Sequence, residues 1–315
     1  MTLMHALQGE RHRAVTTQQL PNGFTRRLAM VLGVVICLVV ALGARQRSLA
    51  ETLEHEPSDP ITFAAIGDFG EDSATHTQVA DLIKSWNPDL IITMGDNRYR
   101  NNTFDTVVGK RYCDYLSNVQ AGTHCQGGHA SENRFFPSIG NHDYSDGGGI
   151  NEYLRYFSLP GNERYYDFVR GPVHFFAINS DRREPDGFRS NSDQARWLQS
   201  TLRASRVAWK VVYFHHSPYS SGRQHGSNSA RQWPFAQWGA DVIISGHEHT
   251  YERIERDGIV YVVNGLGGRK RHRLGSPICG SVTRYQASHG AMFFSATTNR
   301  MEIKGVENYY VSHPW

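Results

Sequence analysis

The chain has 315 residues, of which 20% are charged and 39% are hydrophobic, so it is long enough for one large core or two smaller ones. Its net charge is +3, to which residues 1–50 contribute +5 through six Arg and one Glu, and this leaves about −2 for residues 51–315 with His neutral. This balance excludes a basic nucleic-acid-binding protein, and we expect no nucleic-acid partner.

The first element in chain order is an uninterrupted apolar run at residues 28–44, flanked on both sides by Arg. Its length lies between the core of a signal peptide and a short membrane-spanning helix. Three interpretations remain open: a signal cleaved near residues 48–50, a twin-arginine export signal at residues 25–28, and an uncleaved membrane anchor. We expect an exported protein, periplasmic, extracellular or lumenal, with a membrane contact if this segment is not cleaved.

The rest of the chain divides into an acidic, Pro-containing linker at residues 51–60 and a folded domain at residues 61–315. Short apolar runs in this domain predict five buried strands, at residues 61–66, 90–94, 135–139, 207–214 and 242–245. Helical spacing appears at residues 77–86 and 192–204, hairpins are predicted at residues 164–180 and 254–263, and strand-like runs at residues 292–307. This mixture favours two packed sheets with helices outside rather than one parallel sheet.

The least regular part of the domain is residues 100–134, which we expect to form a surface insertion at the mouth of a site. Cys113 and Cys125 lie within it and would pair in an exported protein, whereas Cys279 is left over. No CxxC pattern occurs, which excludes thiolate zinc sites and redox motifs of that type.

Five short motifs follow the predicted strands in order, and each begins or ends where a strand ends. They are Gly67-Asp68-Phe69-Gly70, Gly95-Asp96-Asn97-Arg98-Tyr99, Gly140-Asn141-His142-Asp143, Val212-Tyr213-Phe214-His215 and Gly246-His247-Glu248-His249. Loops at strand ends are where open α/β sheets carry their sites, and a Gly before a ligand lets the backbone turn sharply. Two carboxylates, a phenol, an amide and three imidazoles suit two hard cations held close together, the equipment for cleaving a phosphate ester.

This ordered set resembles the metallophosphoesterase (calcineurin-like) superfamily, and more narrowly the purple acid phosphatases, also called tartrate-resistant acid phosphatases. Their pattern is GDxG, GDxxY, GNH(D/E), VxxH and GHxH, and the match spans residues 67–249. Most metallophosphoesterases have a His in the first motif, whereas this chain has Gly70 there and has Tyr99 in the second motif. The resemblance implies an α/β fold, a four-layer sandwich of two mixed β-sheets flanked by helices.

The resemblance also implies a dinuclear centre whose two metals share one carboxylate. It assigns one metal to Asp68, Asp96, Tyr99 and His249, and the other to Asp96, Asn141, His215 and His247. Phenolate and carboxylate donors favour Fe(III) at the first position, and the second set suits a divalent Zn, Mn or Fe ion. A metal-activated hydroxide would attack phosphorus, and His142 and His225 are the candidates for contacting the phosphate and protonating the leaving oxygen.

Several motif residues allow a second interpretation. His216 competes with His215, because neighbours at a strand end point to opposite faces and only one can be a ligand. Asp68 and Asp96 could be helix caps, and Tyr99 could be a packed aromatic. Glu248 is expected to point outward.

Outside the motifs, five histidines are expected to be surface or structural residues: His124, His129, His174, His272 and His289. The basic run at residues 269–273 is expected to be a solvated loop, with an anion-steering rim as the alternative.

The predicted function is therefore a phosphomonoesterase of the acid phosphatase type that acts on small phosphorylated substrates. A phosphodiesterase or nucleotide pyrophosphatase could use the same metal centre, because variable loops build the substrate pocket. A non-catalytic surface binding protein that kept the fold is a third alternative, and the complete ligand set argues against it.

Overall fold

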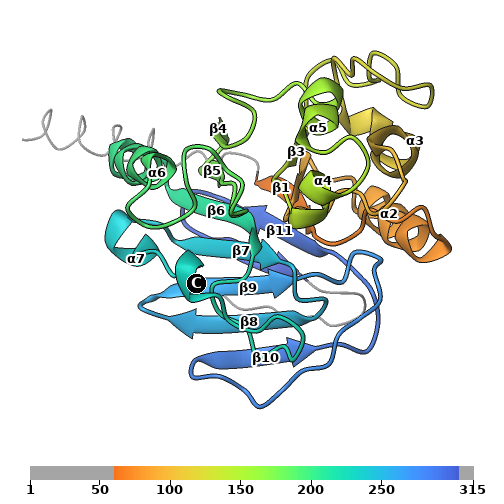
Figure 1. Cartoon of the computed structure of the whole chain (residues 1–315). Helices are drawn as coiled ribbons and strands as arrows, with labels where there is room; N and C mark the ends of the chain where they lie inside the picture. Colours follow the sequence, from red (N-terminus) through yellow and green to blue (C-terminus); the bar gives the residue numbers. More distant parts are fainter. Residues whose placement is uncertain (1–59, 305–315) are drawn as a thin grey trace, which may run out of the picture. The chain divides into compact units, whose positions relative to one another are not determined.

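The computed structural model describes residues 60–304, in which two mixed β-sheets pack face to face (Figure 1). The first sheet has the order β12-β11-β1-β2-β3 and the second has the order β10-β8-β9-β7-β6-β5-β4. The strands of the first sheet are β1 (Ile61–Ile66), β2 (Leu90–Thr93), β3 (Phe135–Pro137), β11 (Met292–Ala296) and β12 (Met301–Lys304). Those of the second are β4 (Tyr166–Arg170), β5 (Val173–Ala177), β6 (Trp209–His216), β7 (Val242–Gly246), β8 (Tyr251–Arg256), β9 (Ile259–Asn264) and β10 (Ser281–Tyr285).

Helices cover the outer faces of both sheets (Figure 1). They are α2 (Ala74–Trp86), α3 (Lys110–Tyr112), α4 (Asn141–Ser145), α5 (Ile150–Tyr156), α6 (Asp193–Ala204) and α7 (Phe235–Trp238). A π-helical turn (Asp105–Gly109) and two 3-10 turns (Cys113–Tyr115 and Ser229–Arg231) complete the helical elements of the described residues. Helices α2 and α5 share an apolar core with the first sheet, and helices α6 and α7 share another with the second sheet.

The alternation of side chains along each strand divides the interior into three apolar layers. In β1, Phe63 contributes to the core between the sheets, and Ala64 contributes to the core under α2. In β6, Val211 contributes to the core between the sheets, and Val212 contributes to the core under α6 and α7. Three cores separate four layers, so the predicted four-layer sandwich of two mixed sheets is confirmed.

The five predicted strands are present, and β1 has the predicted bounds. Both predicted hairpins form, with turns at Gly171-Pro172 between β4 and β5 and at Asp257-Gly258 between β8 and β9. Strands β1, β2 and β3 run parallel to one another, as do β5, β6, β7 and β9. The carboxyl ends of neighbouring parallel strands therefore meet at one edge of each sheet.

The prediction of a surface insertion at residues 100–134 was wrong for the first half of this stretch, whereas most of residues 120–134 lie at the surface. Phe104, Val108 and Tyr112 are buried in the core that packs under α2, and in this stretch Arg100 is the residue that reaches the cavity described below. Apolar residues in this segment lie on short helical turns separated by polar loops, so the sequence shows no helical or strand period.

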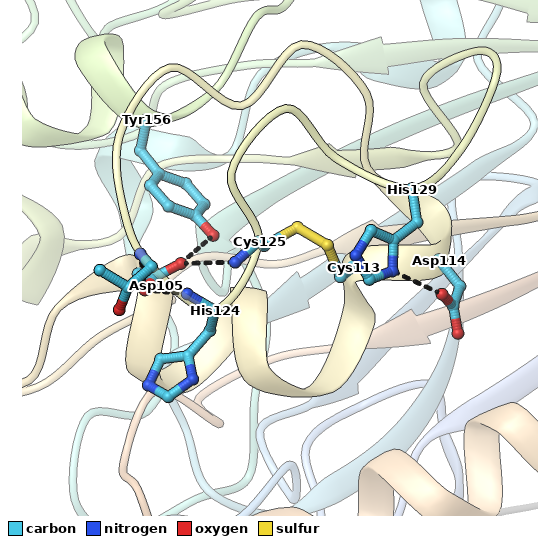
Figure 2. Close-up of a disulfide and its surroundings, with 8 residues drawn as sticks. Asp105, Cys113, Asp114, His124, Cys125, His129 and Tyr156 are labelled. Atoms are coloured by element: carbon cyan, nitrogen blue, oxygen red, sulfur yellow. Dashed lines mark hydrogen bonds and ion pairs between the residues drawn. A yellow bond between two sulfur atoms is a disulfide. The ribbon is translucent and has the colours of Figure 1, made fainter.

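A disulfide between Cys113 and Cys125 fastens this segment, as predicted (Figure 2). The buried Asp105 carboxylate supports the same loop, because it accepts hydrogen bonds from the backbone N–H groups of Thr123 (2.8 Å) and His124 (2.9 Å). Cys279 is exposed and is not part of a disulfide. The loop is thus held by a covalent link and by a carboxylate that fills its centre.

Replacing both Cys113 and Cys125 with serine is expected to lower the free energy of unfolding by about 3 kcal/mol, because the unfolded chain regains the entropy of a loop closed over a sequence separation of 12. Urea unfolding followed by circular dichroism measures the change. Cys279→Ser is the matched control and should leave the midpoint where it is. An unchanged midpoint in the double variant would contradict this role for the disulfide.

In residues 60–304 the structure contains no helix long and apolar enough to cross a membrane. The predicted targeting segment at residues 1–50, with its apolar run at residues 28–44, lies outside the described residues. So do residues 51–59 of the predicted linker and residues 305–315. The division into leader, linker and catalytic domain stays a prediction.

Candidate metal centre

The five motifs meet at one edge of the molecule, because they follow the parallel strands β1, β2, β3, β6 and β7. Asp68 and Asp96 lie just past β1 and β2 and are almost completely buried. His215 is the penultimate residue of β6 and is fully buried. The structure thus brings together the predicted ligands from both sheets.

Three of the predicted ligands adopt the left-handed backbone conformation. The φ angles are 58° at Asp68, 51° at Asp96 and 69° at His247, a region that residues with a Cβ rarely occupy. The prediction that a preceding Gly makes each sharp turn was right for Gly95, whose φ is 77°. The other preceding glycines permit close approach instead: a Cβ on Gly246 would lie 2.6 Å from Asp68 Oδ2. Strain of this kind concentrates at functional sites.

One group of donors surrounds the Asp68 carboxylate. Its Oδ1 lies 3.2 Å from the Tyr99 hydroxyl and 3.3 Å from His249 Nε2, and its Oδ2 accepts a hydrogen bond of 2.8 Å from the backbone N–H of His247. His249 Nδ1 donates to the carbonyl of Lys270 over 2.7 Å. A carbonyl can only accept, so in the neutral ring the Nε2 lone pair faces Asp68.

A second group of donors surrounds His215. Its Nε2 lies 3.0 Å from Asn141 Oδ1, 3.0 Å from His247 Nδ1 and 3.4 Å from Asp96 Oδ1. Its Nδ1 donates to the Met94 carbonyl over 2.8 Å, so the Nε2 lone pair of the neutral ring also faces oxygen atoms. Backbone carbonyls that fix the tautomer of an imidazole in this way are typical of metal-ligating histidines.

These donor sets fit two cations. Burial opposes protonation of His249, but the Asp68 carboxylate outweighs it and raises the pKa of that imidazole, so a proton lies where a bound cation would replace it. Ligand atoms of Asp68, Asp96 and His215 all lie within 4.8 Å of one another. Tyr99 joins the first group, and Asn141 and His247 join the second.

The electrostatics of the buried acids point the same way. Burial raises the pKa of Asp96 to about 7, and the negative charge of Asp68 adds to the shift. Burial and the nearby carboxylates also raise the pKa of Tyr99 well above its usual value. Burial opposes ionisation of Asp68, but the neighbouring His249 outweighs it and lowers the pKa of that carboxyl. Positive charge inside this cluster would therefore stabilise the anionic forms of Asp96 and Tyr99.

The structure bears on two of the alternative interpretations, the choice between His215 and His216 and the possible role of Asp68 as a helix cap. His216 contacts Ser180, whose Oγ lies 2.9 Å from His216 Nδ1, whereas His215 is the neighbour that faces Asp96 and Asn141. A shift in register between Phe214 and His216 accompanies this arrangement. Asp68 does not cap α2, whose N-cap is Ser73.

The two predicted phosphate-contacting histidines both line a cavity of about 770 Å³ in front of the donor groups. His142 Nδ1 lies 2.8 Å from Asp146 Oδ2, and the His142 ring lies 4.5 Å from the Tyr99 ring. The His225 ring stacks on His247 at 3.8 Å. Both side chains therefore lie beside predicted ligands and face the same space.

The prediction that Glu248 points outward was wrong. Glu248 is fully buried and accepts hydrogen bonds from the backbone N–H groups of His225 (2.7 Å) and Gly226 (3.1 Å), and its Oε1 lies 3.0 Å from His272 Nδ1. Burial alone would raise the pKa of Glu248, but these hydrogen bonds lower it, so the carboxylate is ionised. Glu248 thus anchors the loop that carries His225.

Glu248→Gln is expected to lower turnover by about 10- to 100-fold while metal content is kept. The reason is that an amide NH₂ would face the backbone N–H groups of His225 and Gly226, which the carboxylate binds in the wild type. Steady-state kinetics and metal analysis of the purified variant check this. Glu132→Gln, at an exposed position away from the cavity, is the control. Turnover equal to that of the control would show that His225 needs no such anchor.

A buried carboxyl group also supports the second and third motifs. Asp143 is fully buried and accepts from the backbone N–H of Gly140 (2.8 Å) and from Asn97 Nδ2 (2.9 Å), which ties the two loops together. Arg98 is buried as well, and its guanidinium pairs with Glu152 and contacts the Asp146 carbonyl. Asp146 is the residue whose carboxylate contacts His142.

The basic run at residues 269–273 is a loop in which Lys270, Arg271 and Arg273 are exposed, as predicted, and it lies at the mouth of the site. All five of its residues line the cavity, together with Arg100 and Arg223. His272, which we expected to be a surface or structural residue, stacks on His249 at 3.9 Å. The position of the run just after the last motif was the signal that could have identified it. The remaining four histidines of that set do not line this cavity.

Comparisons with known proteins agree with the motifs and the fold. The family described as calcineurin-like phosphoesterase matches residues 61–251. Purple acid phosphatase 21 from Arabidopsis thaliana is 27% identical over 230 residues, which cover 67% of this chain and 51% of that protein. The chain thus spans about half the length of the curated relatives it matches.

Two solved structures share the fold. A purple acid phosphatase from yellow lupin (Lupinus luteus) seeds superposes with a TM-score of 0.63 at 15% identity, over 82% of this chain and 53% of that one. GAP50, the anchor in the inner membrane complex of Plasmodium, superposes with a TM-score of 0.61 at 16% identity, over 82% and 88% of the two chains. The ordered motifs, the two-sheet fold and a family match over more than half of the sequence show that this chain belongs to the calcineurin-like phosphoesterase family.

Proposed function

We propose that this protein is a metal-dependent phosphoester hydrolase that uses a dinuclear centre to cleave phosphate monoesters. The observation that carries the proposal is the convergence of carboxylate, phenol, amide and imidazole donors from both sheets on one buried cluster, in which ligand atoms of Asp68, Asp96 and His215 lie within 4.8 Å of one another. Two donor groups within this cluster, one around Asp68 and one around His215, supply enough ligands for two cations. The similarity to purple acid phosphatases supports the same chemistry.

The donors divide between the two positions by chemistry. Asp68, Tyr99 and His249 would hold one ion, and the phenolate favours Fe(III) there. Asn141, His215 and His247 would hold a divalent Zn, Mn or Fe ion. Asp96 would bridge the two.

The protein's own residues then define where the phosphate lies. When bound, the two ions would polarise the phosphate oxygens and activate the attacking water. His142 lies beside Tyr99 of the first donor group, and His225 lies beside His247 of the second. Both line the cavity and would contact the phosphate. Asp146 holds the His142 ring by Nδ1, and Glu248 holds the loop of His225. One of these two imidazoles would give the leaving oxygen its proton.

Steady-state kinetics on a monoester and a diester with the same leaving group test the proposal. The metal-loaded protein should hydrolyse 4-nitrophenyl phosphate with a higher kcat/KM than bis(4-nitrophenyl) phosphate, and dialysis against a chelator should abolish both activities. A preference for the diester would make the protein a phosphodiesterase on the same centre. No hydrolysis of either ester by the metal-loaded protein would refute a hydrolase.

Tyr99→Phe is expected to remove a visible charge-transfer band from the iron-loaded protein, because the band requires a phenolate bound to Fe(III). Absorption spectra with metal analysis measure this, and Tyr219→Phe, outside the cavity, is the control. A band that survives in Tyr99→Phe would place the chromophore elsewhere. A colourless wild-type protein with two divalent ions would leave Tyr99 as a packed aromatic.

We also propose that the protein is exported, as the N-terminal segment suggests. The disulfide between Cys113 and Cys125 supports this, since such bonds persist in oxidising compartments. Cell fractionation with N-terminal sequencing of the mature protein tests it. Recovery of the uncleaved chain in the reducing cytosol would overturn export.

A further inference from the structure

The cavity in front of the donor groups is far larger than one phosphate group needs. Its volume of about 770 Å³ lies in the range of pockets that hold whole small-molecule ligands. Of the described residues that line it, Asp96 is the only one with a carboxylate, and it is buried among the predicted metal ligands. The rest of the lining is strongly cationic.

Five cationic side chains form what we call the basic rim of this cavity. They are Arg100, Arg223, Lys270, Arg271 and Arg273. All five are exposed. Among the described residues, none of the five has a carboxylate partner within ion-pair distance, whereas the buried Arg98 and Arg111 each have one. Clustered like charges repel one another, so a rim without acidic partners is best explained by an anionic ligand.

The rim is fixed to the predicted metal ligands. The backbone N–H of Arg223 donates to the Arg273 carbonyl over 2.9 Å, and a β-bridge pairs Gly222 with Leu274. The Lys270 carbonyl accepts from His249 Nδ1, a predicted ligand. The cationic groups are therefore held at the mouth of the same cavity as the cleaved phosphate, and not on a separate surface.

The positive charge is local. Residues 51–315 carry a net charge of about −2, so these cations are concentrated against an otherwise slightly acidic domain. A long nucleic acid requires a continuous basic surface, which this balance does not provide. Three separate segments of the chain supply the rim, at residue 100, residue 223 and residues 270–273. This arrangement suits a compact ligand whose anionic groups project in several directions.

We propose that the basic rim binds phosphate groups of the substrate other than the one that is cleaved, so that the preferred substrates are compact small molecules with several phosphates. The cleavage of such substrates rests on the proposed function, whereas their binding by the rim does not. Arg269 is excluded from this role, because its guanidinium pairs with Glu71 (2.6 Å) and lies over the Tyr99 ring.

Binding of a non-cleavable mimic by the full-length, metal-loaded protein tests the rim directly. Calorimetry should show that inositol hexakissulfate binds at least about 100-fold more tightly than inorganic sulfate, because several charge-assisted contacts replace one. The double variant Lys270→Gln with Arg273→Gln should weaken the mimic by about 10-fold or more. Arg206→Gln is the control, since this exposed residue precedes β6 at the end of the strand remote from the site. Equal affinities of the mimic and sulfate, or no effect of the double variant, would overturn the proposal.

Kinetics distinguish contact from long-range attraction. The ratio of kcat/KM for inositol hexakisphosphate to that for 4-nitrophenyl phosphate should fall about 10-fold in the double variant and stay constant in Arg206→Gln. A uniform loss on both substrates would mean steering alone and would overturn the proposal. An oligonucleotide that binds as tightly as the mimic would overturn the compact substrate class. If no phosphate is cleaved but the mimic still binds through the rim, the proposed function fails and the rim's role stands.

Discussion

Asp96→Ala is expected to remove both metal ions and to lower phosphate hydrolysis by at least about 10³-fold. The Asp96 carboxylate lies between the two donor groups. It is near His215 on one side, and on the other side it helps to raise the pKa of Tyr99. Loss of the ions removes several kcal/mol of transition-state stabilisation. Metal analysis by mass spectrometry and kcat on 4-nitrophenyl phosphate measure the two effects. Retention of two metals per chain would refute the bridging role.

A control must separate metal loss from unfolding. Burial and Asp68 raise the pKa of Asp96 to about 7 in the folded, metal-free protein, above the usual value near 4. A group with a raised folded pKa stabilises the fold while it is protonated, and this contribution is lost as the pH rises from about 4 through 7. Metal-free Asp96→Asn should therefore be at least as stable as the metal-free wild type at pH 7. A much lower urea midpoint would show that the carboxylate has a structural role.

Replacing His142 or His225 with alanine is expected to lower kcat by about 10²- to 10⁴-fold without loss of metal, because neither lies in the two donor groups and both line the cavity. The residue that donates the proton should show the larger loss on an alkyl phosphate, whose leaving alcohol needs protonation, than on 4-nitrophenyl phosphate. Rates across a series of leaving groups, with metal content determined for each variant, measure this.

His129→Ala is the matched control for these two variants, since His129 is exposed, contacts Asp114 and does not line the cavity. Full activity of both His142→Ala and His225→Ala would remove these residues from the mechanism. Equal losses on all leaving groups would keep them as phosphate contacts and assign the proton to another donor.

Much of the fold could be predicted because its central strands are short continuous apolar runs. Residues 63–66 of β1 are buried on both faces, and the Gly-Asp that follows marks the end of the strand. The same runs placed the motifs at strand ends, which is why the sequence could bring Asp68, Asp96 and His215 to one site. The strand β10 was missed, since its Ser, Thr and Arg residues carry little apolar signal.

Other features depend on contacts that no local pattern records. Glu248 was placed outward by strand alternation, but β7 ends at Gly246, and the left-handed φ of His247 redirects the chain so that Glu248 points inward. The basic run lines the cavity because the Lys270 carbonyl bonds to His249, a contact between loops 21 residues apart. The roles of His215 and His216 can be distinguished only by their tertiary contacts, which are with Asn141 for His215 and with Ser180 for His216.

The most direct test of the dinuclear hydrolase is a metal titration of the chelated protein with activity measured at each step. If two cations share the cluster of Asp68, Asp96 and His215, hydrolysis of 4-nitrophenyl phosphate should stay low up to one equivalent of metal and rise to a plateau at two. Full activity at one equivalent, or no activity with two ions bound, would contradict the account.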